Sequence, residues 1–74
     1  MSARQLSRLE RAAKRFKLTP RETEALTLLA GGTKRDAVAA EMGITPRGVQ
    51  FHLEKIFRKV GVQTLAAVVP KMIL

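Results

Sequence analysis

The chain has 74 residues and a formal net charge of +8, from fourteen Lys and Arg residues against six Asp and Glu residues. This length allows one small domain, and no apolar run approaches the roughly 18 residues that a transmembrane helix needs. The absence of Cys excludes disulfides and Cys-based zinc sites. One His and no Tyr leave few groups for catalysis, so we expect neither an enzyme nor a bound metal, cofactor or small molecule. The start lacks the features of a secretory leader, which favours a cytoplasmic protein.

The positive charge is concentrated at the N-terminus. Residues 1–17 carry six basic side chains and one acidic one, a net of +5, which leaves +3 for residues 18–74. Such charge is typical of a protein that binds an anionic polymer, either nucleic acid or an anionic membrane surface, although it can also serve solubility alone. Apolar side chains at intervals of three and four predict a basic amphipathic helix over residues 1–17. Its apolar stripe consists of Leu6, Leu9, Ala13 and Phe16.

The next predicted helix begins at a capping box that runs from Thr19 to Glu22. The Thr19 hydroxyl can accept a hydrogen bond from the Glu22 N–H, while the Glu22 carboxylate reaches back to the Thr19 N–H. Pro20 suits the first helical position, where its missing N–H costs nothing. Gly31 and Gly32 end the helix because glycine adopts a positive φ without strain.

Three more helices follow in the sequence. Thr33 is predicted to cap a helix that ends at Gly43, and residues 46–60 and 65–74 form two further helices. No strand alternation or internal repeat is present, so the predicted fold is all-α. The tight turn over residues 42–45 joins two of the helices in the manner of a helix-turn-helix.

The helix predicted over residues 46–60 has two distinct faces. Projection at 100° per residue gathers its inner apolar stripe within about 60°. That stripe consists of Val49, Leu53, Ile56 and Val60. The opposite face suits base edges, because Arg pairs with guanine, Gln with adenine and Glu with the cytosine amino group. The predicted base-contacting residues are Arg47, Gln50, Phe51 and Glu54.

Several of these side chains have a second interpretation. Phe51 can pack on a thymine methyl group, or it can pack under the N-terminal helix or against a second subunit. Glu54 either reads a cytosine or is neutralised by a basic neighbour: Arg47, Lys55 or Arg58. His52, at the edge of the apolar stripe, is expected to pack or to face a phosphate. It has no Cys or second His with which to bind a metal.

Three blocks of the sequence resemble the LuxR/FixJ-type (GerE-like) helix-turn-helix domain. Residues 18–26 resemble its opening, residues 39–45 its turn, and residues 49–62 its recognition helix and exit. The resemblance covers about residues 18–69. It implies a four-helix DNA-binding domain that inserts its third helix into the major groove of promoter DNA and usually dimerises through its last helix.

The resemblance also assigns positions. Gln50, Phe51 and Glu54 fall where family members contact bases, while His52 and Lys59 fall on the family's usual His and a typical basic position. Gly48 stands in place of a common Thr near a phosphate, and residues 34–36 depart from the family's Ser, Asn and Lys. Because Asp36 would repel a phosphate, the contacts on that helix are expected from its basic neighbours. The predicted DNA-backbone contacts are Lys34, Arg35, Thr45, His52, Lys55, Arg58 and Lys59.

The tail over residues 65–74 is apolar nearly all round and therefore needs burial. A two-fold contact between two tails is one way to bury it, and a tail folded back on its own domain is the alternative. Pro70 is expected to kink or end the helix. The predicted dimer interface consists of Leu65, Val68, Val69, Met72 and Ile73.

The sequence thus predicts an all-α chain in two parts: a basic amphipathic helix over residues 1–17 and a four-helix LuxR-type helix-turn-helix domain over residues 18–74. The predicted function is that of a sequence-specific, dimeric, double-stranded-DNA-binding transcriptional regulator with no membrane partner. The rival interpretation is a protein-docking module that resembles sigma-factor region four and acts through RNA polymerase or regulator contacts. For residues 1–17, phosphate contacts, cover for the core and binding to another protein all remain open, with an anionic membrane surface as a distant fourth alternative.

Overall fold

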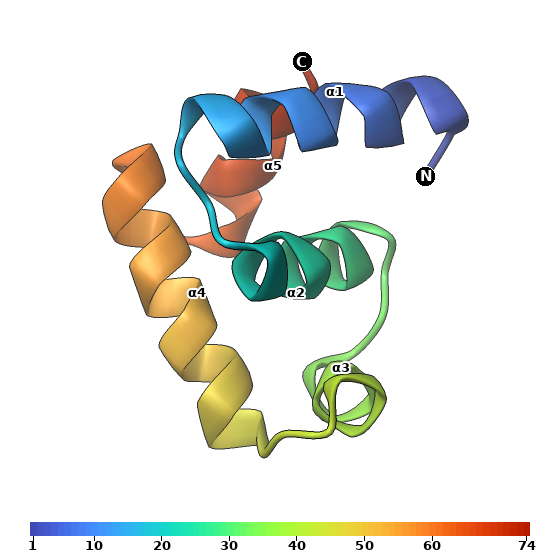
Figure 1. Cartoon of the computed structure of the whole chain (residues 1–74), viewed down its shortest axis with the longest axis vertical. Helices are drawn as coiled ribbons and strands as arrows, with labels where there is room; N and C mark the ends of the chain where they lie inside the picture. Colours follow the sequence, from blue (N-terminus) through green and yellow to red (C-terminus); the bar gives the residue numbers. More distant parts are fainter.

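The predicted helices are all present, in a computed structural model that describes all 74 residues. Figure 1 shows their arrangement. They are α1 (Ala3–Arg15), α2 (Pro20–Ala30), α3 (Arg35–Met42), α4 (Pro46–Val60) and α5 (Leu65–Ile73). No strand is present, which confirms the all-α prediction. None of the five helices is both long and apolar enough to span a bilayer.

Side-chain hydroxyls start four of the five helices. The capping box of α2 is confirmed: Thr19 Oγ1 accepts from the Glu22 N–H at 3.1 Å, and Glu22 Oε1 accepts from the Thr19 N–H at 3.0 Å. The hydroxyls of Thr45 and Thr64 cap α4 and α5, each by accepting from the N–H three residues on. Ser2 does the same for α1. Each bond satisfies one of the N–H groups that a helix start leaves free.

The predicted cap of α3 was wrong. Its N-cap residue is Lys34 rather than Thr33, and the Lys34 side chain makes no capping hydrogen bond. The reason lies in the preceding turn. Thr33 N–H donates to Leu28 O at 3.0 Å, so Thr33 belongs to the closing turn of α2, and the first hydrogen bond of α3 runs one residue later, from Val38 N–H to Lys34 O at 2.9 Å.

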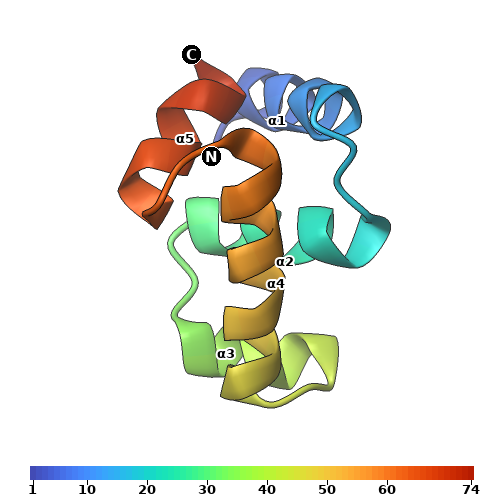
Figure 2. The ribbon, with the colours of Figure 1, turned by 90° about the vertical axis from the view of Figure 1, so that its left-hand side faces the viewer.

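α3 and α4 form the helix-turn-helix unit. Gly43 adopts a left-handed conformation (φ 68°), and Ile44 N–H donates to Ala39 O at 2.9 Å, which closes the end of α3. Arg21 of α2 donates to Met42 O at 2.6 Å and ties the turn to α2. α4 packs against both α2 and α3 (Figures 1 and 2). Its predicted inner stripe is confirmed, because these residues are buried: Val49, Leu53, Ile56 and Val60.

α1 and α5 pack against each other at one end of the molecule (Figures 1 and 2). Leu9 and Ala13 of the predicted α1 stripe are buried, as is Ala12, whereas Phe16 is half-buried and Leu6 lies at the edge with 37% of its surface exposed. The buried residues of α1 belong to the same cluster as those of the other four helices. Residues 1–17 therefore cover part of the core. α5 continues past the exposed Pro70 to Ile73, so the proline does not end the helix.

Candidate nucleic-acid interface

The outer face of α4 points away from α2 and α3 (Figure 2). Arg47, Phe51 and Glu54 are exposed there, and Gln50 is half-buried. These are the side chains predicted to contact bases, and they share one face because the apolar positions of the same helix are used to pack on α2 and α3. The structure thus brings the predicted base-contacting residues together, while contact with a base remains a prediction.

Phe51 lies on this face with 54% of its surface exposed. It does not pack under α1, so within one chain that alternative is not realised. Lys55 Nζ lies 4.5 Å from the centroid of the Phe51 ring, which is a favourable cation–π geometry. The half-buried His52 ring lies 6.2 Å from Phe51, centroid to centroid. Its Nδ1 is enclosed and has no hydrogen-bond partner. An exposed aromatic ring beside a cation suits a surface that meets nucleic acid.

Gln50 is held by a residue of the preceding helix. Arg35 Nη1 of α3 donates to Gln50 Oε1 at 2.8 Å, across the helix-turn-helix. The bond fixes the direction of the Gln50 amide and leaves its NH₂ group free to donate. A side chain predicted to contact the DNA backbone therefore orients one predicted to contact bases. Helix periodicity could not show this contact, because the two residues lie on different helices.

Glu54 has no ion-pair partner. The two ion pairs of the chain are Arg21–Glu24 at 3.0 Å and Lys59–Glu22 at 2.7 Å. Of the two alternatives for Glu54, neutralisation by an ion pair with a basic neighbour on α4 is therefore not realised. Its carboxylate is exposed and can accept a hydrogen bond from a ligand.

Lys59, at the other end of α4, is occupied within the fold. Its Nζ donates to Glu22 Oε1 at 2.7 Å and to Lys17 O at 3.1 Å. Burial by itself raises the pKa of Glu22. The hydrogen bonds from Lys59 and from the Thr19 N–H, with the charges of Lys59 and Lys55, lower that pKa by more, so it lies below its ordinary value of 4.5. Lys59 thus has a structural role beside the predicted phosphate contact.

The sequence did contain a signal for the burial of Glu22. Glu22 shares one helix face with Leu26 and Leu29, four and seven residues on, and all three are buried. The capping box alone predicts only a capping role for Glu22. Its place on the apolar face also predicts that it needs a basic partner from another helix, since a buried carboxylate without one is costly.

The residues predicted to form a dimer interface divide into two groups. Val68 and Met72 are buried within the chain's own core, at 0% and 3% exposure. They are therefore unavailable to a second copy in this fold, because α1 and the other helices already cover them. Leu65, Val69 and Ile73 remain half-buried. The inner side of α5 thus follows the alternative prediction, in which the tail folds back on its own domain.

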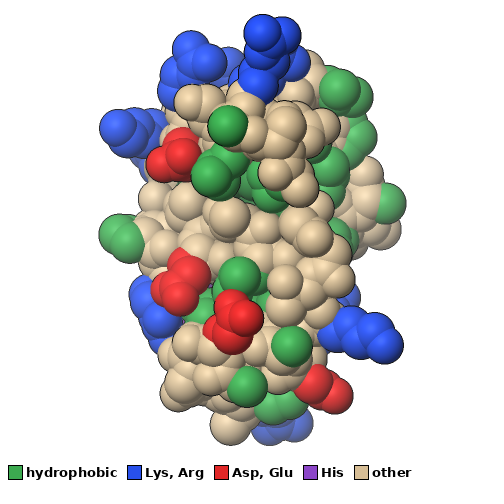
Figure 3. All heavy atoms as spheres, turned by 90° about the vertical axis from the view of Figure 1, so that its right-hand side faces the viewer, with side chains coloured by type: hydrophobic (Ala, Val, Ile, Leu, Met, Phe, Trp, Pro, Cys, Tyr) green, Lys and Arg blue, Asp and Glu red, His purple; other side chains and the backbone are tan.

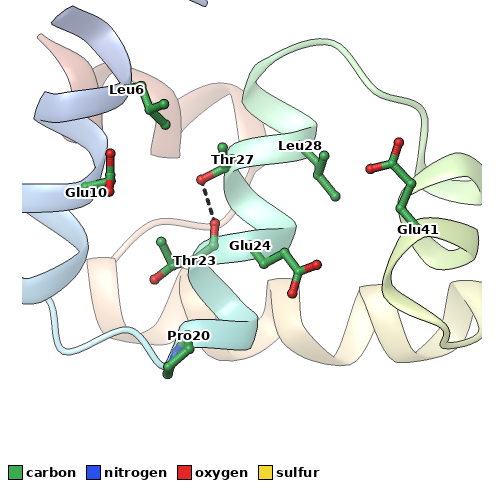
Figure 4. Close-up of a pocket in the computed structure, with 8 residues that line it drawn as sticks. All are labelled: Leu6, Glu10, Pro20, Thr23, Glu24, Thr27, Leu28 and Glu41. Atoms are coloured by element: carbon green, nitrogen blue, oxygen red, sulfur yellow. Dashed lines mark hydrogen bonds between the residues drawn. The ribbon is translucent and has the colours of Figure 1, made fainter. Parts of the chain in front are cut away.

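The largest hollow of the molecule lies away from α4. It has a volume of about 410 Å³ between α1, α2 and α3, and its lining includes three carboxylates: Glu10, Glu24 and Glu41 (Figure 4). Figure 3 views the side opposite α4, where acidic and hydrophobic side chains gather. No Lys or Arg lines this hollow, so it does not suit a phosphate backbone. No group of three or more potential metal ligands is present in the chain.

A basic chain whose exposed polar helix follows a tight turn and crosses two supporting helices is a helix-turn-helix protein. The family model GerE, described as "Bacterial regulatory proteins, luxR family", matches residues 17–72. The chain therefore belongs to the LuxR family of bacterial regulatory proteins. This match confirms the resemblance and the LuxR-type fold inferred from the sequence, and it places the chain in a DNA-binding class of transcription regulators.

The chain is also similar to two relatives named "Probable transcriptional regulatory protein NarL", from the CDC 1551 / Oshkosh and ATCC 25618 / H37Rv strains of Mycobacterium tuberculosis. Each is 38% identical over 52 residues, which cover 70% of this chain and 24% of the relative. The chain thus spans about a quarter of the length of these relatives. No solved structure was found to match it.

Proposed function

We propose that this chain binds double-stranded DNA sequence-specifically, as a transcriptional regulator, by inserting α4 into the major groove. The observation that carries the proposal is the outer face of α4, where Arg47, Phe51 and Glu54 are exposed beside the half-buried Gln50. A major groove about 12 Å wide admits one α-helix. The protein docks on its target through this face, and the acidic hollow between α1, α2 and α3 remains turned away from the DNA.

Each exposed side chain of this face has a chemical preference. Arg47 suits guanine, Glu54 the cytosine amino group, and Phe51 a thymine methyl group. Because Arg35 already donates to Gln50 Oε1, the Gln50 amide presents mainly its NH₂ donor, which suits the N7 and O6 acceptors of purines. The proposed backbone contacts are Lys34, Arg35, Thr45, His52, Lys55, Arg58 and Lys59.

We also propose that the protein binds as a dimer on paired half-sites, through the side of α5 that the core leaves partly open. Leu65, Val69 and Ile73 provide that side, because Val68 and Met72 are used inside the chain. A two-fold contact of this kind pairs the same surface of both copies. The dimer is therefore expected to use a smaller interface than the five residues predicted from the sequence.

The experiment that tests sequence-specific binding selects bound sequences from a random duplex pool and then measures affinity against salt concentration. Binding through several phosphates gives a log–log slope of about −0.9 for each phosphate neutralised. An enriched motif together with a steep slope supports the regulator. A flat slope without an enriched motif would favour the rival, a module that docks on RNA polymerase or another regulator.

Single substitutions then separate the roles of the side chains. Gln50→Ala and Glu54→Ala are each expected to relax preference at one base pair per half-site and to cost ~1–3 kcal/mol on the selected sequence. Gln63→Ala is a matched control, because Gln63 is an exposed glutamine outside α4. Equal losses on all sequences for Gln50→Ala would show that it contacts the backbone instead.

A further inference from the structure

The outer side of α1 carries a row of four arginines: Arg4, Arg8, Arg11 and Arg15. Their spacing of four, three and four residues places them within about 60° of one another around the helix. At 1.5 Å per residue the row is about 16 Å long. All four side chains are exposed. Figure 3 shows Lys and Arg side chains gathered at the end of the molecule where α1 lies.

The fold does not use most of this charge. Arg8 Nη1 donates to Ile73 O at 3.3 Å, and the Arg15 guanidinium lies 5.3 Å from the Phe16 ring centroid. Arg4 and Arg11 have no such partner, and none of the row forms an ion pair. Glu10, the one acidic residue of α1, lines the hollow toward α2 instead. The row therefore offers free guanidinium groups to solvent.

A hollow beside the row has room for a phosphate group. It has a volume of about 370 Å³ and lies between α1 and the end of α5, where Arg8, Arg11 and Arg15 line it. Arginine binds phosphate oxygens through two parallel N–H donors, so a row of exposed arginines suits a phosphate backbone. A membrane surface is a poorer partner, because an interfacial helix must insert its apolar face into the bilayer. In α1 that face is buried: Leu9, Ala12 and Ala13.

The row lies at a distance from the start of α4. α1 is at one end of the longest axis of the molecule and the start of α4 is at the other (Figures 1 and 2). That axis is 29 Å long. From its last turn near the end of α4, α1 extends away from the outer face of α4 (Figure 1). A straight duplex held along α4 therefore does not follow the arginine row over its length.

We propose that the arginine row of α1 is a second, sequence-independent binding surface for the phosphate backbone of duplex DNA. One molecule then holds two DNA segments, one on α4 and one on α1. The inference rests on the proposed function, since α4 supplies the first DNA contact. It also gives a function to the +5 charge of residues 1–17, which lies largely outside the helix-turn-helix.

The test is a bridging assay with the whole chain. A 60-base-pair duplex on beads, a labelled 60-base-pair duplex in solution and the purified protein are mixed, and retention of the label is measured. The variant Arg4→Gln/Arg11→Gln removes two charges that have no partner in the fold, and Gln preserves helix propensity. We expect it to retain at least about fivefold less label than the wild type. Its binding to one duplex should keep the wild-type salt slope.

The matched control is Lys55→Gln/Arg58→Gln, which removes two charges from α4. It is expected to weaken binding to a single duplex and to reduce the salt slope by about 1.8, at about 0.9 per phosphate contact. If this control leaves binding to a single duplex unchanged, the proposed function of α4 fails. If instead the control behaves as expected and only the α1 variant does not, the inference about α1 fails and the proposed function of α4 stands.

Three results would overturn the inference about α1. Retention at the wild-type level in the α1 variant means that bridging arises elsewhere, for example from two α4 surfaces of a dimer. A salt slope lowered by about 1.8 on one duplex means that α1 contacts the same duplex as α4. If the α1 variant loses the binding of the wild type to phosphatidylserine vesicles and bridges two duplexes as the wild type does, the arginine row binds a membrane surface instead. Circular dichroism and light scattering verify that both variants keep the fold and mass of the wild type.

Discussion

Replacement of Lys59 by Met should destabilise the fold, although Lys59 lies on a helix whose outer face is assigned to DNA. Methionine keeps an unbranched apolar side chain but removes the ammonium group, which lies 2.7 Å from Glu22 Oε1. The Glu22 side chain is only 2% exposed, whereas that of Lys59 is 32% exposed. The variant therefore leaves a buried carboxylate whose remaining hydrogen-bond donor is the Thr19 N–H.

The expected loss follows from this geometry. A hydrogen bond to a charged group contributes ~1.5–3 kcal/mol to stability, and removal of one partner from a fully buried ion pair costs ~3–5 kcal/mol. Since Lys59 is one-third exposed, water can reach the carboxylate after the substitution and the lower range applies. We expect the free energy of unfolding to fall by about 2 kcal/mol. In Glu22→Gln/Lys59→Met the loss should be smaller than the sum of the single losses, because no buried charge remains.

The measurement is urea denaturation followed by far-UV circular dichroism, because the chain has no Trp or Tyr to report by fluorescence. Lys14→Met is the control: Lys14 is exposed and forms no ion pair, so its replacement should change stability by less than ~0.5 kcal/mol. If Lys59→Met changes stability as little as this control, the ion pair does not stabilise the fold. The DNA affinity of the folded Lys59→Met variant then tests the phosphate contact separately, because loss of such a contact weakens binding to all sequences equally.

Four further predictions follow from individual residues. The lowered pKa of Glu22 contributes stability that is complete above the ordinary carboxyl pKa of 4.5 and is lost as the pH falls through the lower pKa of the folded state. The urea concentration at the unfolding midpoint should therefore fall more between pH 7 and pH 3 in the wild type than in Glu22→Gln. Lys34→Ser adds the hydroxyl cap that α3 lacks; it should raise the free energy of unfolding by ~0.5–1 kcal/mol in urea melts while weakening DNA binding equally on all sequences. Gly43→Ala should cost ~1–2 kcal/mol in the same melts, because φ is 68° there although the space for a methyl group is open. Pro70→Ala restores a backbone donor inside α5 and should raise the thermal midpoint; an unchanged midpoint would mean that the helix adapts to proline without strain.

The helix caps could be predicted from the sequence because each depends on residues close together in the chain. The capping hydroxyls of Thr19, Thr45 and Thr64 act on N–H groups three residues away, so their role can be inferred from the adjacent sequence alone. Thr33 failed the same inference because it lies one residue before the N-cap: Lys34 O, not Thr33 O, accepts the first hydrogen bond of α3. A cap can be assigned only when it is known where the preceding turn ends, and that depends on the positive φ of Gly32.

The hydrophobic periodicity of the sequence did not predict the contacts between side chains of different helices. Periodicity placed Gln50 on the outer face of α4, but the Arg35 bond to it spans 15 residues, and the Lys59–Glu22 pair spans 37. Each depends on the angle at which two helices cross, which the hydrophobic pattern does not determine. The assignment of base contacts can therefore come from one helix, whereas the direction of the Gln50 amide needs the structure.

The tail illustrates the same limit and bears on the proposed dimer. Its apolar composition predicted burial but not the partner, and α1 and α4 provide that cover for the side that contains Val68 and Met72. What remains for a second copy is one side of a nine-residue helix, about 13 Å long, with three half-buried side chains. Stable dimers bury at least ~1,200 Å², which such a strip does not supply alone. We therefore expect pairing to depend on DNA, which holds two copies on adjacent half-sites at high effective concentration.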